Sequence, residues 1–553
     1  MKALNQVGHL LVRASVQTSK RRFDQSRKQL EAIQRNRLAQ LLALTAGTTS
    51  AERFGIDAKT SWEAYAHQVP LTDYSDWKNL IESQRQDQAF RLSQSPVMRY
   101  QPTSGSTSAV KWIPYTGRFL DELDGAICPW IGDLYDRYPG IRQGAHYWSL
   151  SWVPTEMRAT TRGHINDDMK LLSAGKRWLV GATQAVPDQV SLAPTSDDSL
   201  FATLAYLVAR VDLTAISIWS PTFGLGLLEK LALWREELAE VLKRGNWSAR
   251  TATFGSLPCP RAPLRAAKLM SWNGSIESNF FRELWPQLAL VSAWDTAAAA
   301  PWARHLHSLL PQAQFQGKGL WATEGVVTIP YQDKFVLACR SHVYEFEDVE
   351  TQQILAPWQL EEGQEVIPIL STGSGLLRYR MNDVLVVDGY QGELPCLRFL
   401  GRNDGVDLVG EKISAVLAQQ LLEELEWPPG VSPVTLLGAD EGGANGRPAY
   451  VLLAEASADI PRPLRTVYAE RLAEQLELRL NRHFHYLVAR NLNQLGSLRC
   501  LCLPNARQVY LEQCRERGMI EGNIKIEALR HWRGPLPMDM RTTRNRRGVR
   551  AAT

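Results

Sequence analysis

Long apolar runs are absent from this chain. The longest, such as residues 204–209, fall far short of the ~18 consecutive apolar residues that a membrane-spanning helix needs. Residues 1–16 carry a few apolar side chains but lack the apolar core and the cleavage site of a secretory signal peptide. The sequence therefore predicts neither a membrane span nor a secretory leader.

Cysteine is scarce and irregularly placed. The chain has seven cysteines, an odd number, and no C-x-x-C pair of the kind that holds a metal. Cys500 and Cys502 stand in an apolar run, where we expect them to pack in a core. These features fit a reducing compartment and place the protein in the cytoplasm.

Excess charge of either sign is also missing. A net charge of +4 over 553 residues argues against a dedicated nucleic-acid surface. Basic residues do gather in residues 1–45, where a rough apolar face predicts helices. They form either the solvated face of those helices or an arm for a membrane or nucleic acid, and the pattern favours the solvated face.

The composition is that of an ordinary globular protein, with 44% hydrophobic and 22% charged residues. The chain is too long for one hydrophobic core, so we expect at least two domains. Residues 117–143 and 201–213 read as helices, and residues 147–153, 215–219 and 288–294 read as buried strands. This alternation predicts α/β layers.

The predicted pattern of secondary structure changes twice further along the chain. Short β runs crowd residues 326–400 and predict a sheet or a small β-barrel. Strands near residues 434–437, 450–454 and 498–503, with a long helix before the last, then predict a smaller α+β domain. We therefore expect a large N-terminal domain at 1–403, a small mobile C-terminal domain at 404–540 and a basic disordered tail at 541–553.

Residues 101–116 combine small hydroxyl side chains with glycine and lysine. Such a loop can surround phosphate, because backbone N–H groups and hydroxyls donate from several directions while a lysine supplies charge. It is not a nucleotide P-loop, since Val110 and Trp112 flank Lys111 where that motif has Gly and Ser or Thr. The alternative is a solvated surface loop. The candidate phosphate ligands are Ser104, Gly105, Ser106, Thr107 and Lys111.

Two acidic motifs follow downstream. Thr323 and Glu324 lie between glycines in G-K-G-L-W-A-T-E-G, where a carboxylate could hold Mg²⁺ on a triphosphate. The alternative is a helix start with an acidic first turn. Asp383 follows R-Y-R and begins an apolar strand, where a carboxylate can bind ribose hydroxyls. The alternative there is an ion pair with Arg378 or Arg380.

A fourth motif, G-R-N-D-G-V-D-L-V-G-E-K at residues 401–412, lies where the composition shifts, as a hinge between domains would. Taken in order, the four motifs resemble those of the adenylate-forming acyl and aryl ligases. Within that superfamily the chain is most similar to the Gretchen-Hagen-type, auxin-responsive acyl-acid amido synthetases, in a bacterial branch. The resemblance covers nearly the whole chain and implies a large adenylate-forming domain followed by a smaller mobile domain.

The resemblance also implies roles for single residues. Ser104, Gly105, Ser106, Thr107 and Lys111 would hold the ATP phosphates. Thr323 would lie near the α-phosphate and acyl group, and Glu324 would ligate Mg²⁺. Asp383 would bind the ribose with help from Arg402, and Asp404 would be the hinge. A catalytic lysine from the small domain matches Lys525 in G-N-I-K-I, for which a solvated surface lysine is the alternative.

Two departures from the family pattern stand out. Ser108 and Ala109 occupy positions where the family usually has glycine, and Glu527 and Ala528 replace a proline and an arginine after the catalytic lysine. The acyl pocket would lie between residues 101–116 and 317–325. Trp148, Trp152 and Trp294 are candidate lining residues, although core packing is the alternative for each.

The function implied by the resemblance is ATP-dependent activation of a small carboxylic acid as acyl-AMP, followed by transfer to an amine or amino acid. ATP and Mg²⁺ would be required, with no nucleic-acid or membrane partner. One alternative is a thiol or alcohol acceptor, such as coenzyme A or a carrier protein. Another is a nucleotide-binding regulatory protein without turnover. Neither the substrates nor the oligomeric state can be deduced from the sequence.

Overall fold

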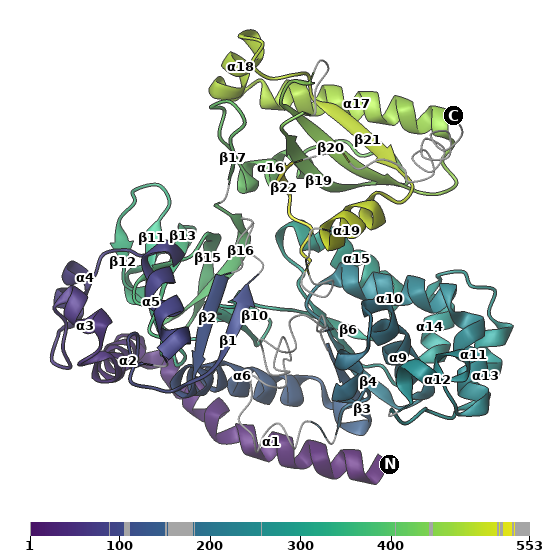
Figure 1. Cartoon of the computed structure of the whole chain (residues 1–553), viewed down its shortest axis with the longest axis horizontal. Helices are drawn as coiled ribbons and strands as arrows, with labels where there is room; N and C mark the ends of the chain where they lie inside the picture. The colour runs from purple at the N-terminus through teal and green to yellow at the C-terminus, as the bar shows by residue number, and fades with distance from the viewer. Residues whose placement is uncertain are drawn as a thin grey trace.

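Figure 1 shows the computed structural model of the chain. The structure describes residues 2–87, 89–103, 111–149, 152, 181, 183–255, 257–403, 405–441, 446–516, 519, 524–533 and 536. Two lobes lie side by side above the long helices α1 and α6, and the C-terminal part of the chain lies above both lobes (Figure 1).

The N-terminal helices support the first lobe. They are α1 (Lys2–Gln25), α2 (Leu30–Thr45), α3 (Thr49–Phe54), α4 (Trp62–Gln68) and α5 (Tyr74–Asp87). Hydroxyl caps define two of their starts, because Thr48 and Ser61 accept the N–H groups of Ala51 and Ala64. The predicted helical character of residues 1–45 is confirmed.

A β-hairpin leads into the central helix of the molecule. Strand β1 (Val97–Thr103) pairs antiparallel with β2 (Lys111–Thr116), and α6 (Gly117–Arg137) follows at once. The Thr116 hydroxyl starts α6 by accepting the N–H of Phe119 at 3.0 Å. Thirteen residues of α6 are buried, so this helix lies in the interior rather than on the surface.

The second lobe is built on a parallel sheet in the order β3-β4-β5-β6. Its strands are β3 (Ala145–Trp148), β4 (Leu213–Ser217), β5 (Leu290–Ala293) and β6 (Gln314–Gly317). Ala215 and Leu290 join the hydrophobic cluster that contains α6, whereas Ile216 and Val291 join the cluster of the outer helices. The sheet is therefore covered on both faces, as parallel sheets generally are, and the α/β prediction is confirmed.

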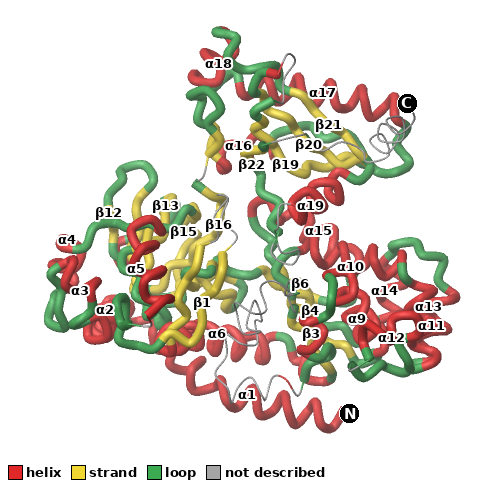
Figure 2. The backbone as a smooth tube through the Cα atoms, viewed as in Figure 1, coloured by secondary structure: helices red, strands yellow, loops and turns green. Residues whose placement is uncertain are grey.

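The outer helices gather on one side of that sheet (Figure 2). They are α9 (Ser196–Ala209), α10 (Pro221–Leu233), α11 (Arg235–Arg244), α12 (Thr251–Phe254), α13 (Pro263–Ser271), α14 (Ser278–Leu284) and α15 (Ala300–Leu309). Apolar residues at helical spacing in 227–241 predict a single helix capped by Gly245. The single helix is wrong, because Trp234 has φ −99° and ψ 14° and separates α10 from α11. The cap at Gly245 is confirmed by its left-handed φ of 71°.

The first lobe contains an antiparallel sheet in the order β12-β11-β13-β15-β16-β10-β9, with β14 paired to β13. Its strands are β9 (Thr328–Tyr331), β10 (Lys334–Leu337), β11 (Val343–Asp348), β12 (Ile354–Leu355), β13 (Glu365–Ser371), β14 (Tyr379–Arg380), β15 (Asp383–Gln391) and β16 (Leu394–Arg402). A separate two-stranded hairpin, β7 (Trp321–Ala322) and β8 (Gly325–Val326), precedes it. The predicted run of short β elements is thus a mostly antiparallel sheet.

The C-terminal part has its own sheet, in the order β21-β20-β19-β22. Its elements are β17 (Gly405–Val406), β18 (Ile413–Ser414), α16 (Ala415–Glu423), β19 (Val431–Ala439), β20 (Ala449–Ala456), α17 (Arg462–Leu480), α18 (Phe484–Asn491), β21 (Arg499–Leu503), α19 (Ala506–Glu516) and β22 (Leu529–Trp532). One face of this sheet packs on α17 and the other joins the cluster of the outer helices, so the α+β prediction is confirmed.

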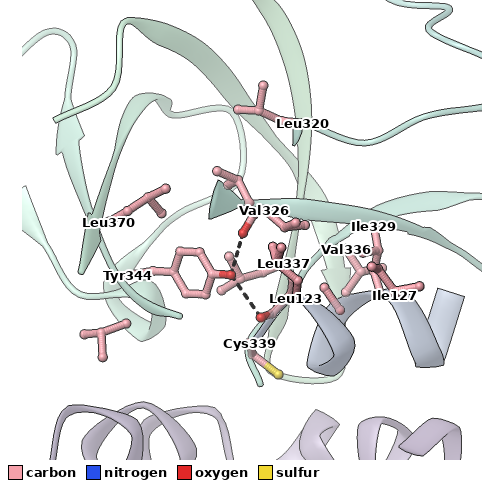
Figure 3. Packing of buried hydrophobic residues seen from close by; sticks show 14 of the residues in the cluster. Leu123, Ile127, Leu320, Val326, Ile329, Val336, Leu337, Cys339, Tyr344 and Leu370 are labelled. Carbon is pink, nitrogen blue, oxygen red and sulfur yellow. Dashed lines mark hydrogen bonds between the residues drawn. The ribbon is translucent and has the colours of Figure 1, made fainter. Parts of the chain in front are cut away.

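The core of the first lobe is made of apolar residues from α6 and the surrounding strands (Figure 3). None of the seven cysteines forms a disulfide. The core position expected for Cys502 is confirmed, whereas Cys500 is half-buried against the same cluster. Among the helices that the structure describes, none is both long and apolar enough to cross a membrane.

Candidate functional site

The phosphate-loop residues connect two paired strand ends. Thr103 and Lys111 are register partners at the open end of the β1–β2 hairpin. Ser104, Gly105, Ser106 and Thr107 lie between them and fall outside the described residues. The ammonium group of Lys111 lies 5.6 Å from the centre of the Tyr74 ring, and the Tyr74 hydroxyl accepts the N–H of Trp112 at 2.8 Å. Tyr74, at the start of helix α5, therefore holds the first two residues of strand β2 in place.

Thr323 and Glu324 are the two loop residues of the β7–β8 hairpin, whose strands pair Ala322 with Gly325. The alternative of a helix start at Glu324 is therefore wrong. The Tyr115 hydroxyl donates to the Thr323 carbonyl oxygen at 3.1 Å, and the Tyr379 hydroxyl lies 3.3 Å from Oε1 of Glu324. These two bonds join the hairpin to the strand after the phosphate loop and to the R-Y-R motif.

The two tyrosines are held largely away from water. Burial raises the pKa of Tyr115 and of Tyr379, and for Tyr379 the neighbouring Glu324 carboxylate raises the pKa further. Both hydroxyls therefore keep their protons at neutral pH and remain donors. Neither tyrosine was singled out from the sequence, although Tyr115 lies within residues 101–116 and Tyr379 within R-Y-R.

Asp383 begins β15 and is the register partner of Arg402, which ends β16. Arg402 donates to Oε1 of Glu527 at 3.3 Å, an ion pair that joins the large sheet to the segment carrying Lys525. The pairing brings Asp383, predicted to bind the ribose, and Arg402, predicted to assist it, to adjacent strand ends.

The arginines of the R-Y-R motif have other carboxylate partners. Arg378 makes a buried bidentate pair with Glu345, at 2.8 and 3.0 Å, and Arg380 pairs with Glu347 at 2.6 and 2.8 Å. These pairs fasten the turn before Asp383 to β11. The motif therefore has a structural role in addition to any role at the ligand.

Lys525 lies where the C-terminal part of the chain meets both lobes. Its ammonium group is 4.2 Å from the centre of the Trp294 ring, at the carboxyl end of β5. The surrounding protein lowers its pKa, while the carboxylates of Asp383, Glu527 and Glu324 raise it. The side chain keeps exposed surface, and two of these carboxylates, Asp383 and Glu324, belong to the sequence motifs.

The structure describes the hinge motif on both sides of Asp404, and Asp404 itself lies outside the described residues. Glu411 accepts the N–H groups of Leu408 and Val409, both at 2.9 Å, and the Tyr450 hydroxyl at 2.6 Å. This buried carboxylate closes the turn before G-E-K and ties it to β20. The acidic residue of that motif thus fixes the turn that follows the expected hinge.

Tryptophans cluster between the parallel sheet and α6. Trp130 packs edge-on against Trp148 and Trp321, with ring centroids 5.8 and 5.7 Å apart. Lys318 donates to the Ser217 hydroxyl at 2.9 Å and lies 4.3 Å from the Trp219 ring centre. Of the tryptophans expected near the acyl group, Trp148 and Trp294 join such aromatic contacts.

The third expected tryptophan, Trp152, donates its indole N–H to the Ala193 carbonyl oxygen at 2.8 Å. Trp130 and Trp219 were missed because nothing local in the sequence marks them, and Lys318 was not singled out although it lies in G-K-G-L-W-A-T-E-G. Their proximity depends on the crossing of α6 over the sheet.

The described protein side chains alone do not form a metal site, so a metal ion would need oxygen atoms from a bound nucleotide. Within the described part of the chain, no group of three or more His, Cys, Asp or Glu residues is placed to bind a metal ion. Mg²⁺, however, usually takes one or two protein carboxylates and completes its shell with phosphate oxygens and water. A lone Glu324 carboxylate at a hairpin tip fits that requirement.

Comparison with protein families gives two matches. Residues 19–315 match the GH3 family N-terminal domain, and residues 335–402 match the GH3 family central domain. Together these two ranges contain Lys111, Asp383 and Arg402, while Thr323 and Glu324 fall in the short gap between them.

Curated plant proteins are similar at low identity. The "Probable indole-3-acetic acid-amido synthetase GH3.2" of Oryza sativa subsp. japonica is 24% identical over 418 residues, which are 68% of this chain and 66% of that protein. The "4-substituted benzoates-glutamate ligase GH3.12" of Arabidopsis thaliana is 21% identical over 409 residues, 68% of this chain and 70% of that one.

Among solved structures, the GH3.15 acyl acid amido synthetase in complex with 2,4-DB has a TM-score of 0.75 to this chain at 17% identity. The superposition covers 91% of this chain and 92% of that chain. This likeness shows that the fold is shared along almost the whole length.

Proposed function

Because this chain belongs to the GH3 family, we propose that the residues around the β7–β8 hairpin activate a carboxylic acid with ATP and transfer the acyl group to an amino acid. The activity is that of an ATP-dependent ligase that forms an acyl-adenylate first and an amide second. The observation that carries the assignment of residues is that Lys525 of the small domain packs on Trp294, while the nearby Glu527 pairs with Arg402, the register partner of Asp383.

The first half-reaction joins the acid to AMP. A carboxylate oxygen of the acid attacks the α-phosphorus of ATP, a new P–O bond forms, and the bond to pyrophosphate breaks. The reaction needs neutralisation of charge on the phosphates more than a side-chain nucleophile. Lys111 and Lys525 supply positive charge, while backbone and hydroxyl groups of Ser104, Gly105, Ser106 and Thr107 would bind the phosphates.

The remaining residues position the nucleotide. The Asp383 carboxylate would accept hydrogen bonds from the ribose hydroxyls, with Arg402 beside it on β16. Thr323 would lie at the α-phosphate, since its carbonyl is held by Tyr115. Glu324 would hold Mg²⁺, which neutralises phosphate charge when bound.

The second half-reaction forms the amide. The unprotonated amine of the acceptor attacks the acyl carbonyl carbon, the bond to the AMP oxygen breaks, and the amine proton is lost to solvent or base. We propose that the small domain at 404–540 turns about Asp404 relative to the large domain at 1–403 between the two steps. That rotation would break the Arg402–Glu527 ion pair and remove Lys525 from Trp294.

The substrate classes follow from relatives. The plant proteins are named for indole-3-acetic acid and for substituted benzoates with glutamate. We therefore propose a small, aromatic or otherwise apolar carboxylic acid and an amino acid. Seven cysteines without a disulfide fit a reducing compartment, and we place the enzyme in the cytoplasm.

Pyrophosphate exchange tests the proposal. The protein is incubated with ATP, Mg²⁺, labelled pyrophosphate and a panel of aryl and fatty acids, and label is expected to return to ATP with at least one acid. Single amino acids are then added, and the product is identified by mass. Exchange that stays at background with every acid would refute activation. A thioester or ester in place of an amide, with coenzyme A or alcohols present, would refute the acceptor class.

A further inference from the structure

The β7–β8 hairpin carries the proposed Mg²⁺ ligand at its tip, so its position decides where Glu324 stands. Its second strand is only Gly325 and Val326, and such a short hairpin needs outside support to hold one position. That support comes from a set of buried polar side chains beneath Val326, none of which the four sequence motifs include.

His342 makes the central contact. Its Nε2 accepts the N–H of Val326 at 3.2 Å, so the ring proton must be on Nδ1, which lies 2.9 Å from Oε2 of Glu122. The His342 side chain is fully buried and the Glu122 side chain is 6% exposed. Phe119 stacks on the imidazole with an interplanar angle of 14°. The two hydrogen bonds fix the tautomer of the ring, and the stacking on Phe119 fixes its plane.

The Val326 carbonyl is held as well. The Tyr344 hydroxyl lies 2.7 Å from the Val326 carbonyl oxygen and 3.1 Å from that of Ala338. Figure 3 shows the Tyr344 ring directed at Val326 from among the apolar side chains of the core. The N–H and the carbonyl of Val326 are therefore both hydrogen-bonded to buried side chains, those of His342 and Tyr344, at the start of β11.

The residue before Val326 must be small. A Cβ atom on Gly325 would lie 2.9 Å from Nε2 and 3.0 Å from Cδ2 of His342, which is closer than side chains approach. The imidazole therefore packs directly against the backbone that follows Glu324. A change in the ring is transmitted to the hairpin without an intervening flexible group.

Glu122 extends the connection to two other parts of the site. The same Oε2 that binds His342 accepts the N–H of Gly373 at 2.8 Å, and the Gly373 carbonyl accepts the Thr116 hydroxyl at 2.7 Å. Gly373 precedes the turn that leads to Asp383, and Thr116 ends the strand that begins at Lys111. The Glu122 carboxylate is thus connected by hydrogen bonds to the β7–β8 hairpin, to the segment before Asp383 and to the strand that starts at Lys111.

We infer that Glu122 and His342 are positioning residues that set the place of Glu324 for the metal–nucleotide complex. The inference rests on the proposed function, since it assumes that Glu324 holds the metal. Removing such a support typically lowers metal affinity or activity by about 10- to 100-fold.

The test replaces the ring but keeps its shape. In His342→Phe the stacking on Phe119 can persist while both hydrogen bonds are lost, and His342→Gln retains an acceptor and a donor. His9→Phe is the matched control, because His9 is also buried and doubly hydrogen-bonded, but to Tyr135 and the Gly144 carbonyl, away from the hairpin. Glu122→Gln keeps the side-chain shape and serves if His342→Phe does not fold.

The readout is Mn²⁺ affinity in the presence of a non-hydrolysable ATP analogue, measured by electron paramagnetic resonance and normalised to folded protein. We expect about tenfold weaker Mn²⁺ binding in His342→Phe, a smaller loss in Glu122→Gln, near-normal affinity in His342→Gln and no change in His9→Phe. Thermal unfolding is measured in parallel and is expected to fall in both Phe variants.

Equal Mn²⁺ affinity in the wild type and in every folded variant of Glu122 and His342 would overturn the inference while leaving the proposed function intact. An equal loss in His9→Phe would show a general effect of destabilisation and would overturn it too. A wild-type protein that neither binds the Mn²⁺–nucleotide complex nor exchanges pyrophosphate would overturn the proposed function, and the inference with it.

Discussion

The ammonium group of Lys525 lies 4.2 Å from the centre of the Trp294 ring, which joins the small domain to the carboxyl end of strand β5. A cation over the face of an indole is attracted by the negative face of the ring. The Arg402–Glu527 ion pair also brings the segment of Lys525 to the strand end where Asp383 is the register partner of Arg402.

Lys525→Ala is expected to lower pyrophosphate exchange about 100-fold, because a positive charge at the α-phosphate acts mainly in the transition state. The dissociation constant for ATP, measured by calorimetry, should change less than about threefold. Lys525→Arg should recover part of the rate, and Lys59→Ala, at an exposed position, serves as the control. Exchange at the wild-type rate in Lys525→Ala would remove Lys525 from the site.

The Arg402–Glu527 ion pair should favour the adenylation arrangement. The two side chains are 33% and 27% exposed, so we expect a contribution of about 0.5–1 kcal/mol. Glu527→Gln should therefore slow exchange about two- to fivefold, and the effect should shrink at high salt. In an Arg402→Gln background the same change should have no further effect. Additive losses in the double variant would contradict the pairing.

Asp383→Ala should weaken ATP binding by about 10- to 100-fold, as expected for loss of a charged hydrogen-bond acceptor. Asp388 lies on the same strand, is 46% exposed and pairs with Lys334 across 3.6 Å, so Asp388→Ala is the matched control. Binding is measured by calorimetry with ATP and Mg²⁺. Normal affinity in Asp383→Ala would exclude the ribose role.

Acidification should destabilise the fold through His146. Burial lowers the pKa of His146 to about 3, with the neighbouring His9 ring 4.4 Å away acting in the same direction. A folded-state pKa below the unfolded value of about 6.5 means that the unfolded chain binds the proton first. The stability is complete above about pH 6.5 and is lost as the pH falls toward 3, by about 2 kcal/mol at pH 5.

The measurement is the free energy of unfolding in urea at several pH values. His146→Phe should lose most of this dependence between pH 7 and 5, although it is less stable at pH 7 because it loses the bond from Nε2 to the Ile141 carbonyl at 2.7 Å. His67→Gln, at an exposed position, should keep the wild-type dependence. A His146→Phe slope equal to that of the wild type would assign the acid sensitivity to other groups.

Local patterns in the sequence were sufficient for much of the fold. Strand-length apolar runs and a glycine located several elements, as at the end of α11 before Gly245. Trp234 shows the limit of periodicity, because an apolar stripe continued across a break between two helices. The stripe reflects burial on one side of both helices, and burial alone does not require an unbroken backbone.

The sequence by itself determined the motifs, their order and hence the family chemistry, because the groups proposed to bind ATP are short runs whose composition is visible locally. Only the tertiary structure decided which residues meet. Glu122 and His342 are 220 residues apart, and Lys525 reaches Trp294 across two domains. Such contacts depend on how α6, the sheets and the small domain pack, and packing is a property of the whole chain that no local run of residues records.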